Sequence, residues 1–204
     1  MNHCETCHKS TTLCLCDVVQ PHKTHTHILI LQHPQEPDHE IGSALLAHQA
    51  LENSTLKIGL SWRNLSALLN KKTVDPTRWV VLYLGSGIKG DIKKLEQLQF
   101  VSKRGHPTEK PKKIEGIIIL DGTWSQAKTL WWRNAWLLKL PRAILNPAHK
   151  SLYRELRKEP RKECLSTIES IADTLDVLGE SPKVSQHLRD LFSQLLMRYR
   201  KNKK

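Results

Sequence analysis

The stretch Gly116-Ile-Ile-Ile-Leu-Asp-Gly-Thr-Trp124 decides the fold class of this chain. Its apolar run at 117–120 is unbroken, as expected of a strand that is buried on both faces of a parallel sheet. The run stops at Asp121-Gly122, and residues 125–138 then have a helical composition that Pro141 ends. A buried strand followed by a sharp turn and a helix is typical of an α/β protein.

The rest of the chain shows the same alternation of strands and helices. The β-rich runs 27–31, 57–60 and 79–84 are candidate strands. Apolar residues three and four positions apart predict amphipathic helices over 41–51 and over two stretches of the C-terminal third. We therefore expect an α/β fold, a mostly parallel sheet flanked by helices, whose ligands bind beyond the carboxyl ends of strands.

The chain has 204 residues, enough for one domain with a hydrophobic core of its own. No uncharged apolar run approaches the roughly 18 residues of a membrane span, so a transmembrane protein is excluded and no membrane partner is expected. The sequence Met1-Asn2-His3-Cys4 lacks the cationic and apolar segments of a secretory signal. We therefore expect a cytoplasmic protein.

The balance of charge favours a polyanionic partner. Lys and Arg number 32 against 20 Asp and Glu, which gives a formal net charge of +12. The cations cluster at 110–113, 154–162 and 198–204. Such clusters are typical of nucleic-acid binding, although a solvated basic surface without that role is the alternative. A DNA-binding regulator ranks last, because neither a helix-turn-helix nor a Cys and His finger is visible.

Four of the five cysteines lie in one short segment, Cys4-x2-Cys7-x6-Cys14-x-Cys16. Two close pairs joined by a short loop can supply the four soft ligands that Zn²⁺ prefers. Disulfides are the alternative, and the reducing cytosol disfavours them. We expect a small zinc knuckle over 1–24, structural because all four positions are sulfur, whereas Cys164 reads as a small buried hydrophobe.

Two predicted strand ends are candidate ligand sites. Gly85-Ser86-Gly87 follows one strand with a tight turn whose backbone amides can face a ligand. Asp121 follows another and either presents its carboxylate in a site or caps the next helix, with neither reading preferred.

Three further features each have two readings. Ser166-Thr167-Ile168-Glu169 has the form of a capping box, which alone accounts for those residues. Arg154 and Arg157 suit carboxylate or phosphate, or belong to a solvated basic face. Trp131, Trp132 and Trp136 form part of a core or a base-stacking platform.

Together these motifs resemble the DTW-domain family, named for the pattern that appears here as Asp121-Gly122-Thr123-Trp124. The resemblance covers most of the chain and includes the cysteine pattern. It also includes segments like Leu31-Gln-His33-Pro34-x-Glu36, Ser151-x-Tyr153-Arg154-x-x-Arg157 and Leu165-Ser166-Thr167-x-Glu169. One departure is the loop 8–13, which lacks the proline expected there.

The resemblance implies a tRNA-uridine aminocarboxypropyltransferase whose catalytic domain, 25–204, is related to the SPOUT methyltransferases and has a C-terminal trefoil knot. Such enzymes transfer the 3-amino-3-carboxypropyl group of S-adenosylmethionine to N3 of a tRNA uridine and release methylthioadenosine. In bacterial members the uridine lies in the variable loop. A methyltransferase of the same fold and a non-catalytic zinc-knuckle RNA-binding protein are the competing interpretations.

The resemblance also assigns residues by class. The catalytic group has Asp121 as the general base for the N3 proton, with Thr123 and Trp124 beside it. The cofactor-binding group contacts S-adenosylmethionine and comprises Gly85, Ser86, Gly122, Leu165, Ser166 and Thr167. The substrate-binding group comprises Tyr153, Arg154, Arg157 and Glu169. The metal ligands are Cys4, Cys7, Cys14 and Cys16, and tRNA is the expected partner.

Overall fold

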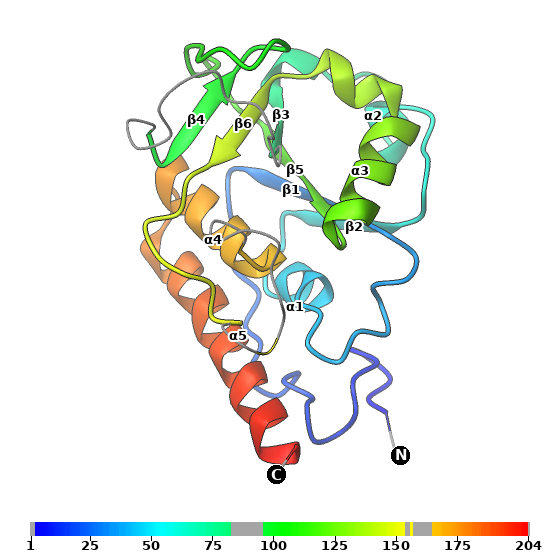
Figure 1. Cartoon of the computed structure of the whole chain (residues 1–204), viewed down its shortest axis with the longest axis vertical. Coiled ribbons are helices and arrows are strands. Elements are labelled where there is room, and N and C mark those ends of the chain that lie inside the picture. Colours follow the sequence, from blue (N-terminus) through cyan, green and yellow to red (C-terminus); the bar gives the residue numbers. More distant parts are fainter. Residues whose placement is uncertain (1–2, 83–95, 154–155, 157–164, 204) are drawn as a thin grey trace.

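One six-stranded sheet organises the chain (Figure 1). The computed structural model describes residues 3–82, 96–153, 156 and 165–203. The strands are β1 (His27–Gln32), β2 (Ser54–Ile58), β3 (Trp79–Leu82), β4 (Leu98–Val101), β5 (Gly116–Asp121) and β6 (Arg142–Leu145). Their order is β2-β1-β5-β3-β6-β4, with every pair parallel except the antiparallel β4 and β6. The predicted mostly parallel α/β sheet is confirmed.

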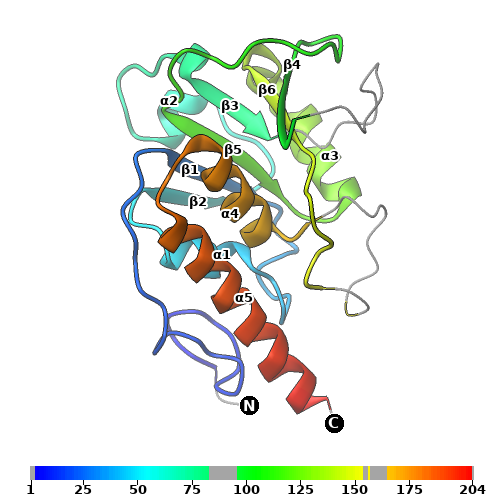
Figure 2. The same cartoon turned by 90° about the vertical axis from the view of Figure 1, so that its left-hand side faces the viewer.

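Helices cover both faces of this sheet. They are α1 (Ala44–Gln49), α2 (Leu65–Leu68), α3 (Trp124–Arg133), α4 (Thr167–Leu178) and α5 (Pro182–Asn202), with 3₁₀ turns at Pro76–Arg78 and Ala135–Lys139. In Figures 1 and 2, α1, α4 and α5 lie on one side of the sheet and α2 and α3 on the other. No described helix combines the length and the apolarity needed to cross a membrane.

Side-chain alternation along the central strands builds two hydrophobic cores. In β1, Ile28 and Ile30 face α1, α4 and α5, whereas Leu29 and Leu31 pack with α2 and α3. The strand β5 repeats this pattern, so its apolar run is unbroken because each face meets helices.

Helix ends follow the capping residues of the sequence. Ser166 caps α4 and accepts a hydrogen bond from the Glu169 amide, while the Glu169 carboxylate returns to the Ser166 amide. This confirms the capping box. Gly179 ends α4 in the left-handed conformation, and Pro182 opens α5 at a position that needs no amide donor.

The sequence did not indicate β4 or β6, and several predicted elements have other bounds. Each missed strand is only four residues long, and β6 directly follows the proline that ends the preceding helical region. Such short strands are defined by pairing partners rather than by their own periodicity. The strand predicted over 57–60 is β2 and ends at Ile58, and the helix predicted over 41–51 is the shorter α1. The helix expected over 125–138 is α3, which ends at Arg133 and is followed by the 3₁₀ turn Ala135–Lys139.

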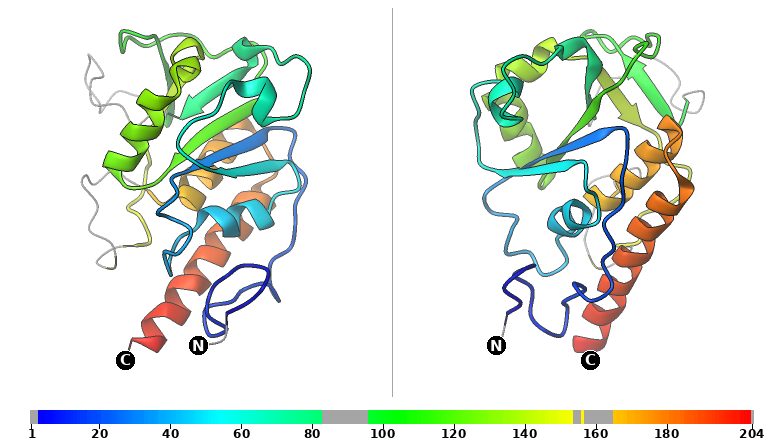
Figure 3. Two further views of the ribbon diagram at one scale, coloured as in Figure 1. Left: turned by 90° about the vertical axis from the view of Figure 1, so that its right-hand side faces the viewer. Right: turned by 180° about the vertical axis from the view of Figure 1, so that it is seen from behind.

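The N-terminal segment packs along the C-terminal half of α5 (Figures 2 and 3). Leu13 and Leu15 are buried in the same core as the inner face of α5. Polar contacts reinforce this packing: the Arg198 guanidinium donates to the Cys14 carbonyl, and Asn202 Nδ2 donates to Thr12 Oγ1 at 2.8 Å. The two termini therefore lie at the same end of the molecule (Figure 1).

A glycine at the start of β5 makes room for a buried indole. A Cβ on Gly116 would lie 2.5 Å from the ring of Trp79, which is 2% exposed and packs in the core of α2 and α3. The ring is enclosed, so it cannot move aside at low cost.

We therefore expect Gly116→Ala to lower the free energy of unfolding by about 1–3 kcal/mol, the usual cost of overpacking. Denaturant unfolding of the whole chain measures this change. The matched control is Ser125→Ala on the exposed face of α3, which should change stability by less than about 0.5 kcal/mol. A Gly116→Ala protein as stable as the parent would contradict the argument.

Candidate active site at the carboxyl ends of β1 and β5

The strand order of the sheet changes direction between β1 and β5, because the chain leaves these two neighbouring strands toward opposite edges of the sheet. From β1 the chain crosses through α1 to β2 at one edge, whereas from β5 it crosses through α3 to β6 on the opposite side. The two crossover helices lie on opposite faces of the sheet (Figure 1). In parallel sheets such a switch point leaves a crevice beyond the carboxyl ends of the two strands, where ligands bind.

The last residues of the two strands meet at this switch point. Gln32 and Asp121 are register partners, and Gln32 Nε2 donates to Asp121 Oδ2 at 2.8 Å. The other carboxylate oxygen of Asp121 accepts a hydrogen bond from the hydroxyl of Thr167, the first residue of α4. Asp121 is 8% exposed, so three elements hold a nearly buried carboxylate in one orientation.

The alternative reading of Asp121 as a helix cap is wrong. The N-cap of α3 is Thr123, which forms a complete capping box with Gln126. Thr123 satisfies the helix amides, so the Asp121 carboxylate is left to bind Gln32 and Thr167.

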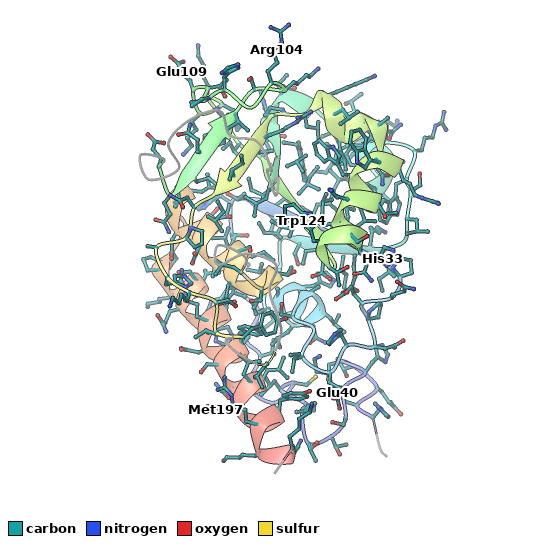
Figure 4. All side chains as sticks on the ribbon, viewed as in Figure 1. His33, Glu40, Arg104, Glu109, Trp124 and Met197 are labelled. Atoms are coloured by element: carbon teal, nitrogen blue, oxygen red, sulfur yellow. The ribbon has the colours of Figure 1, made fainter. Side chains whose placement is uncertain are left out.

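A tight turn joins Asp121 to α3. Gly122 has a φ of +156°, and a Cβ there would lie 2.9 Å from Cβ of Gln126, so the turn requires glycine. The Gln126 side chain also donates to Gln35 at 3.2 Å, and the His33 amide donates to the Asp121 carbonyl at 3.0 Å. The segment after β1 and the start of α3 are therefore in contact beyond the carboxyl ends of β1 and β5, where the general rule for parallel sheets places a ligand crevice; Figure 4 labels His33 and Trp124 in this region.

Glu169 is the centre of a second polar cluster, next to the first. Its carboxylate is fully buried and accepts hydrogen bonds from the Ser166 amide, the Ser166 and Ser151 hydroxyls and the Leu152 amide at 2.6–3.0 Å. Capping explains only the bonds to Ser166. The other two attach the 151–153 segment to the first turn of α4 through Glu169, two residues after the Thr167 that holds Asp121.

The remaining predicted residues lie in different surroundings. Tyr153 is 3% exposed; its hydroxyl donates to the Ile41 carbonyl at 3.1 Å, and its ring packs edge-on against Phe192. Trp124 begins α3 and Leu165 precedes the α4 cap, both half-buried. Gly85, Ser86, Arg154 and Arg157 lie outside the described residues.

The structure adds one candidate site residue, Gln32. The sequence motif around His33 included it, but a glutamine at a strand end has no distinctive chemistry by itself. Only the parallel pairing of β1 with β5 shows that Gln32 contacts the carboxylate.

The four N-terminal cysteines form a candidate metal centre remote from this crevice. Their Sγ atoms all lie within 4.8 Å of one another, with Cys4 to Cys16 at 3.8 Å and Cys7 to Cys14 at 3.7 Å. Ligands about 2.3 Å from a tetrahedral Zn²⁺ would be about 3.8 Å apart, whereas sulfur atoms of a disulfide are about 2.05 Å apart. The geometry fits a metal ion rather than disulfides.

The local environment changes the acidity of these thiols in both directions. Hydrogen bonds from the backbone of Cys7 and Thr6 lower the pKa of Cys4 to about 6. Burial raises the pKa of Cys7 and of Cys16. A bound cation would favour the thiolate at all four positions, since metal ligands must be deprotonated.

A family model described as the DTW domain matches residues 1–200. The chain belongs to the DTW-domain family. Asp121, held at the switch point of the sheet, is therefore the first residue of the motif for which this family is named.

The curated proteins compared below with the chain are all named as tRNA-uridine aminocarboxypropyltransferases. A Macaca fascicularis protein named tRNA-uridine aminocarboxypropyltransferase 2 is 28% identical over 194 residues, which cover 91% of this chain and 59% of that protein. A Drosophila melanogaster protein of the same name is 27% identical, covering 92% of this chain and 70% of that protein. Arabidopsis thaliana tRNA-uridine aminocarboxypropyltransferase A is 25% identical, with coverages of 86% and 72%.

The chain thus spans about 59% of the length of the macaque relative. No solved structure matches it.

The buried hydrogen bonds of Glu169 predict that a substitution of this side chain by its amide will destabilise the protein. In Glu169→Gln, one amide nitrogen replaces a carboxylate oxygen, so at least one buried donor among Ser151, Leu152 and Ser166 is left without an acceptor. We expect the free energy of unfolding to fall by about 1–3 kcal/mol, measured by denaturant unfolding.

The control for this change is Glu52→Gln, because Glu52 is exposed and its only described ion pair, to Lys23, is 4.0 Å long. This control should remain within about 0.5 kcal/mol of the parent. Equal stability of the Glu169 and Glu52 variants would show that the cluster is not a source of stability.

Proposed function

We propose that the protein is a tRNA-uridine aminocarboxypropyltransferase that uses S-adenosylmethionine as donor. The observation that supports this most is the Asp121 carboxylate, oriented by Gln32 and Thr167 at the switch point where such sheets bind ligands. Membership of the DTW-domain family and the names of the curated relatives agree with this activity.

The reaction sets what the site must do. S-adenosylmethionine supplies an electrophilic γ-carbon next to its sulfonium; a bond forms between this carbon and uridine N3, the carbon–sulfur bond breaks, and methylthioadenosine leaves. The N3 proton must go to a base within hydrogen-bond reach, and Asp121 is that base in our proposal. The donors described for its two oxygens, Gln32 and Thr167, are both neutral.

The neighbouring residues position this base and its reactants. Thr123 fixes the start of α3 and thus the turn at Gly122, and Trp124 packs the loop or stacks on the uridine. Thr167 fixes one oxygen of Asp121, and Ser166 holds the start of α4. Gly122, Leu165, Ser166 and Thr167, with Gly85 and Ser86, would contact the donor.

Recognition of the substrate is assigned to the segment before α4. Arg154 and Arg157 would bind the amino acid carboxylate of the donor or tRNA phosphate, since a guanidinium suits either anion. Glu169 and Tyr153 would act from the interior: both are buried, and their bonds hold the 151–153 segment that leads to those arginines. The net charge of +12 suits tRNA.

Three further parts of the proposal concern architecture and location. A relationship of residues 25–204 to the SPOUT methyltransferases, with a C-terminal trefoil knot, fits the parallel sheet with helices on both faces. The segment 1–24 would be a zinc knuckle that shares the core of α5, and the protein would act in the cytoplasm.

The metal of the cysteine cluster would be Zn²⁺, because four sulfur ligands at tetrahedral spacing suit that ion. With all four positions occupied by sulfur, it would leave no open position for catalysis. It would instead fix the loop whose Leu13, Leu15 and Cys14 contact α5.

The catalytic role of Asp121 is tested by Asp121→Asn, which keeps the shape of the side chain but removes the base. The new amide nitrogen is a donor, so Gln32 keeps its contact only by turning its own amide oxygen toward it. We expect 3-amino-3-carboxypropyluridine formation to slow by about 10²- to 10⁴-fold, measured by nucleoside mass spectrometry of tRNA incubated with protein and S-adenosylmethionine.

Asp75→Asn is the matched control, because Asp75 is an exposed aspartate that caps the turn before β3, away from the crevice. It should keep the parental rate. An Asp121→Asn protein with full turnover would refute the assignment, and a methylated product would refute the proposed reaction.

Metal removal gives a separate prediction. The purified protein should contain one zinc ion per chain by elemental analysis, and Cys7→Ser should lose it. Chelation should lower the free energy of unfolding by about 4 kcal/mol if free zinc was at a thousand times its Kd. Cys164→Ser should keep the zinc, and a melting temperature that chelator leaves unchanged would contradict a structural metal.

A further inference from the structure

One tryptophan of α3 is turned to solvent. Trp132 is 70% exposed, the highest value among the large hydrophobic side chains that the structure describes as exposed, the others being Ile58 and Met197. An exposed indole of this size offers a flat apolar face and is typical of a binding surface.

The neighbouring tryptophans are used in the core, so Trp132 differs from them. Trp131 is 5% exposed and packs under the guanidinium of Arg142, 4.8 Å from the ring centre. Trp136 is half-buried and donates its indole N–H to the Trp62 carbonyl at 3.0 Å. Of the two readings of this tryptophan group, the core explains two members and leaves Trp132 unexplained.

Trp132 lies on a row that begins at the candidate active site. Trp124, Lys128 and Trp132 are four residues apart, so they follow one another along one side of α3. Helix geometry places Trp132 about 12 Å along the axis from Trp124. Trp124, labelled in Figure 4, is the first residue of α3 and follows Asp121 closely in the chain, and Lys128 is exposed.

The stretches of sequence that contain α3 and α2 carry positive but no negative side chains. The sequence contains no Asp or Glu from 122 to 154, a stretch that includes Lys128, Arg133 and Lys139. It also contains none from 53 to 74, the stretch that includes α2, on the same face of the sheet. The helices of the other face differ in carrying both signs of charge. Their acidic residues are Glu169 and Asp173, which are fully buried, and Asp176 and Asp190. Their cations, all on α5, are Lys183, Arg189, Arg198, Arg200 and Lys201. The outer surface of α3 therefore offers cations to a polyanion, with no acidic residue in its own stretch of sequence to oppose them.

We propose that Lys128, Trp132 and Arg133, the outer surface of α3, bind the unpaired nucleotides of tRNA next to the target uridine, with one base stacked on Trp132. This inference rests on the proposed function and extends it from the reacting base to its neighbours. Lys128 and Arg133 would pair with phosphates of the same strand.

Single-stranded RNA is the occupant that these residues fit. Stacking on an aromatic ring together with cations along the backbone is how unpaired nucleic acid is bound without sequence readout. The axial distance from Trp124 to Trp132 corresponds to about three to four steps of a stacked strand, at 3.4 Å for each step. A strand whose target base enters the crevice can thus reach Trp132 within a few nucleotides.

The test compares RNA affinities of the full-length protein by fluorescence anisotropy, with no donor present. The two probes are a labelled tRNA and a ten-nucleotide oligouridylate. Trp132→Ala should weaken binding of both by about 5- to 100-fold, whereas Trp132→Tyr keeps an aromatic face and should remain within about threefold of the parent. Lys128→Gln should reduce the salt slope of oligouridylate binding by about 0.7.

Met197→Ala is the matched control, because Met197 is a large exposed side chain on α5, remote from α3 (Figure 4). Its affinities should equal those of the parent. All variants should keep the parental melting temperature, since the altered side chains are exposed.

The outcomes separate this inference from the proposed function. If the parent modifies tRNA and Trp132→Ala raises its KM for tRNA in step with the loss of affinity, the inference holds. Unchanged affinity of Trp132→Ala for both probes overturns it, whether or not the parent is active. The parent protein could also prove to be a dimer that becomes monomeric in Trp132→Ala while its RNA affinity is unchanged. This result would overturn the inference and assign the surface to contact with a second copy of the chain. A parent that binds RNA through Trp132 but forms no product would overturn the proposed function alone.

Discussion

The arrangement of the candidate site depends on the hydrogen bonds that hold the Asp121 carboxylate. One comes from Gln32 at the end of β1 and the other from Thr167 at the start of α4, so three segments far apart in the sequence converge on two oxygen atoms. A carboxylate that is 8% exposed is unfavourable unless such donors accompany it, which ties the sheet register and the position of α4 to this one group. Its orientation is therefore fixed before any ligand arrives.

A second carboxylate extends this arrangement to the segment before α4. Glu169 belongs to the same first turn of α4 as Thr167, and its four donors include the Ser151 hydroxyl and the Leu152 amide. The start of α4 thus has two roles: it orients Asp121 through one side chain and holds the 151–153 segment through another. A movement of α4 would disturb both at once, so the packing of α4 on α5 also supports the site.

The two faces of the sheet have different roles. The face of α1, α4 and α5 contains the larger core and receives the cysteine segment, whose Leu13 and Leu15 are buried against α5. The face of α2 and α3 has a smaller core, lies in stretches of sequence without acidic residues, and leaves Trp132 in solvent. The larger core is therefore on the first face, and the exposed indole with its neighbouring cations is on the second.

The sequence by itself determined the α/β class, the capping box that starts α4 and the cysteine cluster, because each depends on residues close together in the chain. The unbroken run before Asp121 required a strand buried on both faces, and Ser166 with Glu169 required a helix start. Only the tertiary structure decided that Thr123 rather than Asp121 caps α3, that Gln32 contacts Asp121, and that Trp132 differs from Trp131 in exposure. The reason is physical: these properties depend on which strand lies beside which and on which side of a helix meets the sheet, and long-range packing sets both. The strands β4 and β6 escaped prediction for the same reason, since strands of four residues are defined by their partners.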